Sequence, residues 1–238
     1  MKFQGAAKRL DDIDLPRLGA LIGVGEDELH AFLEVEARGS GFDQQGRLKM
    51  LFEPHVFYRN LAGVKRTQAV RAGLAYKNWK PGAYPKDSYP RLLAALAIDE
   101  TAALKACSWG IGQILGENHK AAGYATPQAM VAAFVEDEEA QLEGVINFIR
   151  ANGLADELKR HDWAGFARGY NGAGYAKHGY HTKLAAAFRK WQGIPDTPLT
   201  GAKPRATPAR PAPQPLPSRP APAGFFARLR AALTRTAA

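Results

Sequence analysis

Apolar residues recur at helical spacing over most of the first 194 residues, and this pattern predicts a mainly helical domain. In the segment 137–150, for example, the core-facing positions are Leu142, Val145, Ile146 and Ile149. Other helices are predicted over 14–22, 26–38, 54–61, 64–74, 89–106 (bent near Asp99), 126–135, 181–191 and from Asp162 into RGYNGAGYA. Residues 76–88 are rich in Trp, Tyr, Gly and Pro, which predicts a loop.

Strand patterns are scarce. The best candidate is 47–52, which we expect to be the second arm of a small β-hairpin turning near 44–46. Because helices dominate and strands are few, the predicted fold class is α+β, mainly α.

The helix predicted up to residue 38 directs one of two neighbouring glutamates towards its apolar face. At about 100° per residue, Glu36 falls in the same arc as Leu29 and Phe32, whereas Glu34 lies on the opposite side. A carboxyl group on an apolar face is costly to ionise, so its pKa should rise. A raised pKa suits a general acid working near neutral pH. The alternative is an edge position at which Glu36 is solvated or paired.

The net charge of +9 is unevenly distributed. Seven basic residues and no acidic residue lie in 201–238, whereas the first 200 residues hold the other 25 basic side chains and all 23 acidic ones. The domain is therefore nearly neutral, which argues against a nucleic-acid partner. The one cysteine, Cys107, excludes an internal disulfide and is expected to be a buried structural thiol. No Sec signal and no run of about 20 apolar residues is present.

Composition changes after residue 194. Ten of the 16 prolines lie in 195–223, which predicts a disordered, Pro-rich linker. In 224–238 the apolar residues share one arc of a helix and the arginines lie outside it. This pattern is typical of a short basic amphipathic helix at a membrane interface, with a frayed or docked tail as the alternative. The expected organisation is a domain over 1–194, the linker and this helix.

Three motifs occur in order along the domain: EARGSG, which contains Glu36, SWGIGQI at 108–114, and GYNG at 169–172. Together they resemble the motifs of the lysozyme superfamily that includes goose-type lysozymes and soluble lytic transglycosylases. The stretch 15–192 further resembles the phage N-acetylmuramidase family through LFEPHVFYR, SWGIGQILGENH and RGYNGAGYA.

This resemblance implies a lysozyme-like fold with Glu36 as the general acid that protonates the leaving glycosidic oxygen. The family commonly has Ser after this glutamate, and here Ala37 takes its place. The substrate-binding residues that the resemblance implies are Ser108, Gly110, Gln113, Tyr170 and Asn171. For the last two, the alternatives are a core position for Tyr170 and a helix-end cap for Asn171.

The second carboxylate is less clearly indicated. Inverting hydrolysis needs a base about 6.5–9.5 Å from the acid, and Glu53 at the end of the strand candidate is favoured. The alternatives are Asp43, a structural ion pair of Glu53 with an arginine, and assistance by the substrate's N-acetyl group. The last of these would give an anhydro sugar.

These implications predict a peptidoglycan-degrading muramidase that cleaves the β-1,4 bond between N-acetylmuramic acid and N-acetylglucosamine. It would act as a monomer, without an organic cofactor or a metal, since the histidines show no metal-ligand spacing. As an endolysin it would be made in the host cytoplasm without a Sec signal and act in the periplasm after release. Residues 224–238 would contact anionic membrane or lipopolysaccharide. The competing functions are a lytic transglycosylase and a non-catalytic wall- or membrane-binding protein.

Overall fold

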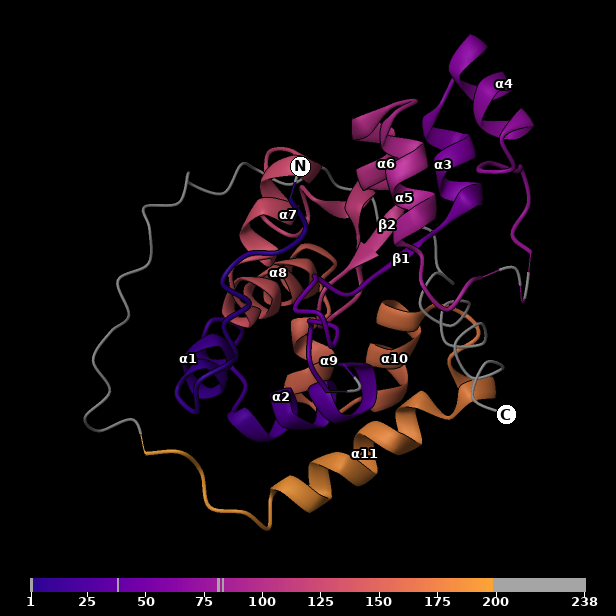
Figure 1. Cartoon of the computed structure of the whole chain (residues 1–238). Coiled ribbons are helices and arrows are strands. Elements are labelled where there is room, and N and C mark those ends of the chain that lie inside the picture. The colour runs from indigo at the N-terminus through magenta and orange to yellow at the C-terminus, as the bar shows by residue number, and fades with distance from the viewer. Residues whose placement is uncertain (1, 38, 81, 83, 199–238) are drawn as a thin grey trace.

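The computed structural model describes residues 2–37, 39–80, 82 and 84–198. The predicted amphipathic helix 224–238 and the predicted linker beyond residue 198 lie outside the described residues. Figure 1 shows that helices make up most of the described chain. They are α1 (Asp14–Ala20), α2 (Glu26–Phe32), α3 (Pro54–Asn60), α4 (Gly63–Arg71), α5 (Tyr89–Leu96), α6 (Glu100–Lys105), α7 (Pro127–Phe134), α8 (Glu138–Ala151), α9 (Ala155–Lys159), α10 (Trp163–Asn171) and α11 (Tyr180–Trp191). A π-helical turn, η1 (Leu33–Ala37), and the 3-10 turns η2 (Gly116–Asn118) and η3 (Ala176–His178) complete the helical elements.

The strands form one antiparallel sheet in the order β1-β2-β3, namely β1 (Met50–Phe52), β2 (Cys107–Trp109) and β3 (Ile114–Leu115). The mainly-α, α+β prediction is confirmed, but the expected hairpin does not itself form the sheet. Its two arms meet at the isolated bridge Phe42↔Leu48, while β1 pairs with β2. Every residue of β2 and β3 is buried, so these strands show no alternation that the sequence could reveal.

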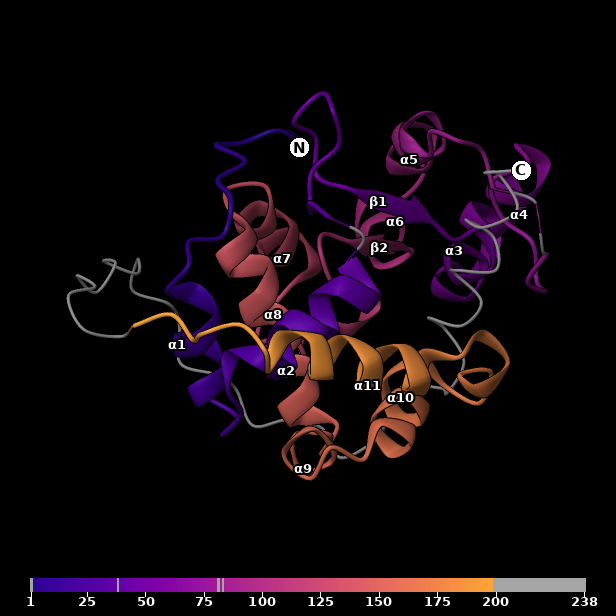
Figure 2. The ribbon, with the colours of Figure 1, turned by 90° about the horizontal axis from the view of Figure 1, so that it is seen from below.

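The elements gather at two ends of the molecule. In Figures 1 and 2, helices α3–α6 and the sheet lie at one end, and α1, α2, α9, α10 and α11 lie at the other, with α8 between them. Helices α2 and α11 run side by side in both views and pack against each other. The three sequence motifs therefore come from elements on both sides of α8.

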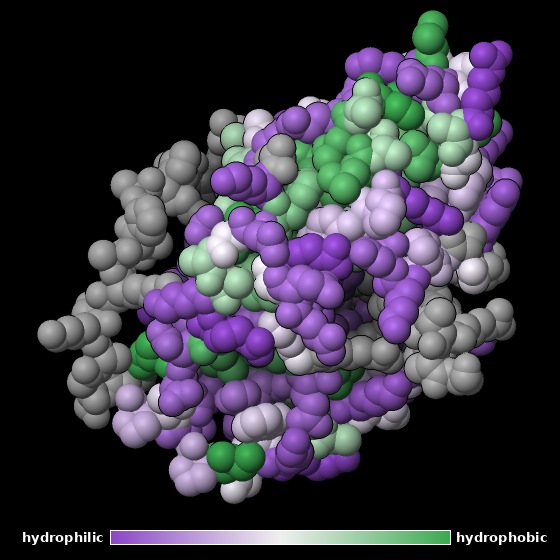
Figure 3. Space-filling model, in the orientation of Figure 1, coloured by the Kyte–Doolittle hydropathy of each residue, from purple (hydrophilic) through white to green (hydrophobic). Residues whose placement is uncertain are grey.

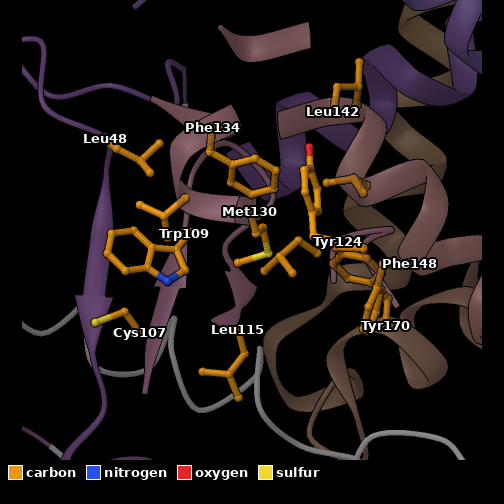
Figure 4. Packing of buried hydrophobic residues seen from close by; sticks show 14 of the residues in the cluster. Leu48, Cys107, Trp109, Leu115, Tyr124, Met130, Phe134, Leu142, Phe148 and Tyr170 are labelled. Atoms are coloured by element: carbon orange, nitrogen blue, oxygen red, sulfur yellow. The ribbon is translucent and has the colours of Figure 1, made fainter. Parts of the chain in front are cut away.

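Trp109 on β2 lies at the centre of the core. Its side chain is fully buried, its ring stacks on Phe3 at 5.7 Å, and its Nε1 donates to the Leu104 carbonyl at 3.0 Å. Figure 4 shows it in one cluster with side chains of α7 such as Phe134. The neighbouring Cys107 is fully buried, and burial raises the pKa of its thiol. This side chain is therefore inert and structural, as predicted.

Local capping signals determine several helix boundaries. The Thr126 hydroxyl accepts from the Ala129 N–H at 3.1 Å and begins α7, as predicted. The helix predicted over 89–106 is two helices, because Asp99 leaves the helical conformation and caps α6 by accepting from the Ala102 N–H at 2.9 Å.

The surface is mixed in character. Figure 3 shows hydrophilic residues across the middle of the face and an apolar patch over α5 and α6, where Leu93 is 57% exposed. Within the described residues, no helix has the length and apolar composition needed to cross a membrane.

Candidate active site

Glu36 lies on the π-helical turn η1 that continues α2. The sequence predicted a regular α-helix here, and that prediction is wrong for residues 33–37. A π-turn places an extra residue in the turn, so the side chains after it are rotated relative to an α-helix. Such turns are rare and occur frequently at functional sites.

The two glutamates of this turn have different surroundings. Glu34 is exposed, and its Oε2 accepts from Lys190 Nζ at 2.8 Å and from Trp191 Nε1 at 3.0 Å on α11. The bond from Lys190 lowers the pKa of Glu34. Glu36 is half-buried and faces a different helix.

The partner of Glu36 comes from the third motif. Asn171, the last residue of α10, is fully buried, and its Nδ2 donates to Glu36 Oε1 at 3.2 Å. The helix ends directly afterwards at Gly172, whose φ of +80° favours glycine. Asn171 is therefore more than a helix-end residue, because it holds one oxygen of the carboxyl group.

Tyr170 connects this pair to the second motif. Its ring is buried between Phe32 and Phe148, with centroids 5.2 and 5.7 Å away and nearly perpendicular rings. Its hydroxyl donates to the Gly112 carbonyl at 3.2 Å. Tyr170 is thus a core residue with its polar end on the turn of the second motif.

That turn is held by its own side chains. The hydroxyl of the buried Ser108 donates to Gln113 Oε1 at 3.1 Å, and Gln113 Nε2 donates to the Gly110 carbonyl at 2.8 Å. Gln113 has a φ of +49°, a backbone conformation that non-glycine residues seldom adopt. Such conformations persist where the surrounding structure enforces them, often at binding sites. Hydrogen bonds thus link predicted residues of all three motifs.

Glu53 lies at the far end of β1 and precedes α3. It is 1% exposed, and its backbone N–H donates to the Ala106 carbonyl at 2.8 Å. The Tyr84 hydroxyl donates to its Oε2, and His55 Nδ1 lies 3.3 Å from the same oxygen. Among the described residues, its partners are thus a phenol and an imidazole, and no arginine pairs with it.

Sequence reasoning missed Tyr84. Burial, and then the carboxylate of Glu53, raise the pKa of its phenol, which therefore remains protonated and donates. The tyrosine belongs to the predicted loop 76–88, whose aromatic content was the available signal. Nothing in the sequence placed that loop against Glu53.

Asp43, the alternative second carboxylate, has a local role. Its Oδ1 accepts from the backbone N–H groups of Gln45 and Arg47, each at 2.9 Å, and its Oδ2 accepts from Arg47 Nε at 2.7 Å. These bonds close the hairpin turn between residues 43 and 47.

In the part of the chain that the structure describes, no three or more His, Cys, Asp or Glu side chains are grouped so that they could bind a metal ion. His119, which follows the second motif, is buried, and its Nδ1 lies 2.9 Å from the Tyr124 carbonyl oxygen. Burial lowers the pKa of His119. These contacts indicate a structural role.

Comparisons with known proteins cover this same region. A family model described as N-acetylmuramidase matches residues 26–192. Among solved structures, the chain is similar to the crystal structure of the Burkholderia AP3 phage endolysin, with a TM-score of 0.73 and 36% sequence identity. That match covers 79% of this chain and 73% of the other. A search of curated proteins found no match. The range matched by the family model contains all three motifs.

Proposed function

Because the chain belongs to the N-acetylmuramidase family, we propose that Glu36 is the general acid with which it cleaves peptidoglycan. Degradation of peptidoglycan is the activity of this protein. The bond we propose is the β-1,4 linkage between N-acetylmuramic acid and N-acetylglucosamine, and the proposed outcome is hydrolysis.

The observation that carries the proposal is the hydrogen bond from Asn171 to Glu36. Because Asn171 Nδ2 occupies Oε1 at 3.2 Å, the acidic proton belongs on Oε2. The amide also restricts rotation of the carboxyl group. A fixed donor of this kind is what general acid catalysis requires.

In the proposed reaction, Glu36 gives its proton to the glycosidic oxygen as the C1–O bond breaks. A water molecule adds to C1 and loses its proton to a base on the other face of the sugar. We propose Glu53 for the base or for orienting this water. Asp43 is a poorer candidate, since three hydrogen bonds within its own turn occupy both of its oxygens.

The remaining predicted site residues belong to, or support, the turn that we propose faces the substrate. We propose that the turn from Gly110 to Gln113 lines the site with backbone groups, and that Ser108 fixes the Gln113 amide. Tyr170, which is buried, supports this turn from behind through Gly112.

Substitution of Glu36 tests the proposal. Glu36→Gln keeps size and polarity but cannot supply a proton, so release of muropeptides from purified peptidoglycan should fall by at least about 10²-fold. Glu34→Gln is the matched control on the same turn and should stay near the wild-type rate. Cleavage by Glu36→Gln at near the wild-type rate would rule out the assigned acid.

Mass spectrometry of the products decides between the two reaction outcomes. Products with reducible N-acetylmuramic acid ends are expected from hydrolysis. Products with 1,6-anhydro ends would instead identify a transglycosylase on the same scaffold.

We also propose that residues 1–194 form the catalytic domain and that 195–238 serve as a tether and an envelope-binding helix. The basic, acid-free composition of 201–238 supports attraction to anionic lipid or lipopolysaccharide. As an endolysin, the protein would reach the wall after release from the host cytoplasm.

A further inference from the structure

Helix α8 runs behind the proposed site and contacts several of its parts along one face. The residues of this face are Glu138, Gln141, Val145 and Phe148, spaced three or four apart. Phe148 packs against the ring of Tyr170, and a Cβ added to Gly112 would lie 2.1 Å from Val145 Cγ2. The first two residues of the face are polar and buried, which is costly unless both are hydrogen-bonded.

Glu138 holds the turn that follows Glu36. Its side chain is 3% exposed, and its Oε1 accepts from the Ser40 hydroxyl and from the Gly41 N–H, each at 2.7 Å. Its Oε2 accepts from the Leu10 N–H at 3.2 Å and from Arg9 Nε at 3.1 Å. Four donors thus compensate the buried charge and fix the Ser40–Gly41 turn against α8.

Gln141 holds the turn of the second motif. It is fully buried, and its Oε1 accepts from the Ile111 N–H at 2.7 Å. Its Nε2 donates to the Phe134 carbonyl at 2.8 Å. Because the Phe134 carbonyl accepts the hydrogen bond from Nε2, the amide is oriented with Oε1 towards the Gly110–Gln113 turn.

The same amide also separates the two turns. Both turns place a glycine against this amide. A Cβ added to Gly41 would lie 1.8 Å from Gln141 Oε1, and a Cβ added to Gly110 would lie 2.7 Å from the same atom. Only residues without a side chain therefore allow the two backbones to approach the amide so closely. The backbone of Lys49 joins the two turns directly, since its N–H donates to Gly41 at 2.8 Å and its carbonyl accepts from Gly110 at 2.8 Å. Moving one turn therefore disturbs the other.

We propose that Gln141, supported by Glu138 one turn earlier on α8, is a positioning residue that fixes the substrate-lining turn relative to the turn after Glu36. The inference rests on the proposed function, because it takes those two turns to be parts of one active site. Neither α8 side chain needs to touch the substrate. Loss of the Gln141 acceptor leaves the buried Ile111 N–H unpaired, so the turn must shift to find another partner.

Two substitutions separate positioning from stability. Gln141→Met has similar volume but removes both hydrogen bonds. Gln141→Glu keeps an oxygen acceptor for the Ile111 N–H, while a carboxylate oxygen replaces the donor that faced the Phe134 carbonyl. If ionised, this carboxyl group would face the Phe134 carbonyl and destabilise the protein; if neutral, as burial favours, its O–H can donate to that carbonyl as the amide did. In either state the Glu variant should keep the turn in place.

The control lies on the same helix. Asn147 is half-buried, and its Nδ2 donates to the Ala122 carbonyl at 3.4 Å, away from both turns. Asn147→Leu keeps the branched shape of the side chain and removes a side-chain-to-backbone bond from α8. It reports what loss of stability in α8 alone does to the site.

The experiment measures two quantities in the full chain carrying Glu36→Gln, namely the melting temperature and the Kd for soluble, uncross-linked glycan strands with their stem peptides. We expect Gln141→Met to weaken binding at least about tenfold and both Gln141→Glu and Asn147→Leu to stay within about threefold, whatever their melting temperatures. Binding that follows melting temperature across the three variants, or unchanged binding in Gln141→Met, would overturn the inference.

Failure of the proposed function is recognised separately in the same experiment. If Glu36 is not the acid, the Glu36→Gln background will cut the strands, and new products will be visible before any comparison of the Gln141 variants.

Discussion

The two carboxylates proposed for catalysis have contrasting environments. Glu36 is half-buried and held by the amide of Asn171, whereas Glu53 is 1% exposed and accepts from the phenol of Tyr84. Different environments are what give two carboxylates different roles in glycoside hydrolysis. At the scale of residues, the proposal that Glu53 assists the attacking water is therefore open to direct test.

For Glu53→Gln we expect at least about a 10²-fold loss of muropeptide release with a folded protein, because an amide cannot accept the proton of water. Circular dichroism and a melting curve check the fold. Tyr84→Phe is the control: it removes the hydrogen bond but leaves the carboxylate, so its loss should be smaller. A folded Glu53→Gln enzyme with full turnover would favour assistance by the substrate's N-acetyl group.

At the scale of elements, the pairing of α2 with α11 supports the turn that carries Glu36. The His30 and Trp191 rings stack with centroids 3.8 Å apart, and Glu34 accepts from Lys190 and Trp191. Burial lowers the pKa of His30, an effect that nearby Lys190 strengthens and that Glu26 and Glu34 oppose. The folded chain therefore prefers the neutral imidazole.

This preference sets the sign of a pH effect on stability. With a folded pKa below the unfolded value of about 6.5, the unfolded chain takes up the proton first as pH falls. The stabilisation by neutral His30 is complete above about pH 6.5 and is lost progressively below it. Glu34 acts in a lower window: its pKa is depressed, so its contribution is lost only below the ordinary value of a glutamate.

We expect His30→Phe, which keeps a ring on Trp191 but cannot titrate, to reduce the fall in melting temperature between pH 7 and pH 5. Part of the fall in melting temperature should remain in this variant, because the pKa of His119 is also lowered by burial. Melting curves of the two proteins across this range are sufficient. Equal slopes for variant and wild type would show that His30 does not contribute.

At the scale of the whole molecule, most of the net positive charge lies in a different part of the chain from the residues proposed for catalysis. The described part extends to residue 198, and the Thr197 N–H donates to Glu26 Oε1 at 2.7 Å at the start of α2. The seven basic residues without acidic neighbours all follow in 201–238. A truncation after residue 198 keeps the Thr197 contact and removes this charge.

We expect removal of 199–238 to leave activity on purified peptidoglycan nearly unchanged. Binding to vesicles with anionic lipid should fall, since each basic residue near such a surface contributes about 1 kcal/mol, and killing of intact Gram-negative cells should fall with it. In the full chain, vesicle binding should weaken as salt increases. Loss of wall activity with unchanged vesicle binding would instead make the tail part of the catalytic unit.

The sequence by itself determined the features that depend on neighbouring residues. Helical periodicity located most helices, Thr126 and Asp162 begin α7 and α10 as predicted, and three ordered motifs indicated the N-acetylmuramidase family, which the comparisons confirm. Capping and periodicity involve residues close together in the chain, so both can be recognised from the sequence alone.

Tertiary structure alone decided which distant groups meet. The bond from Asn171 to Glu36 spans 135 residues, Glu138 reaches Ser40 across 98, and β1 pairs with β2 rather than within its own hairpin. The π-turn at Glu36 likewise has no signal in a periodic pattern. These contacts depend on how the buried faces of α8, α10 and the sheet pack together, and packing complementarity is a property of the assembled core rather than of any segment.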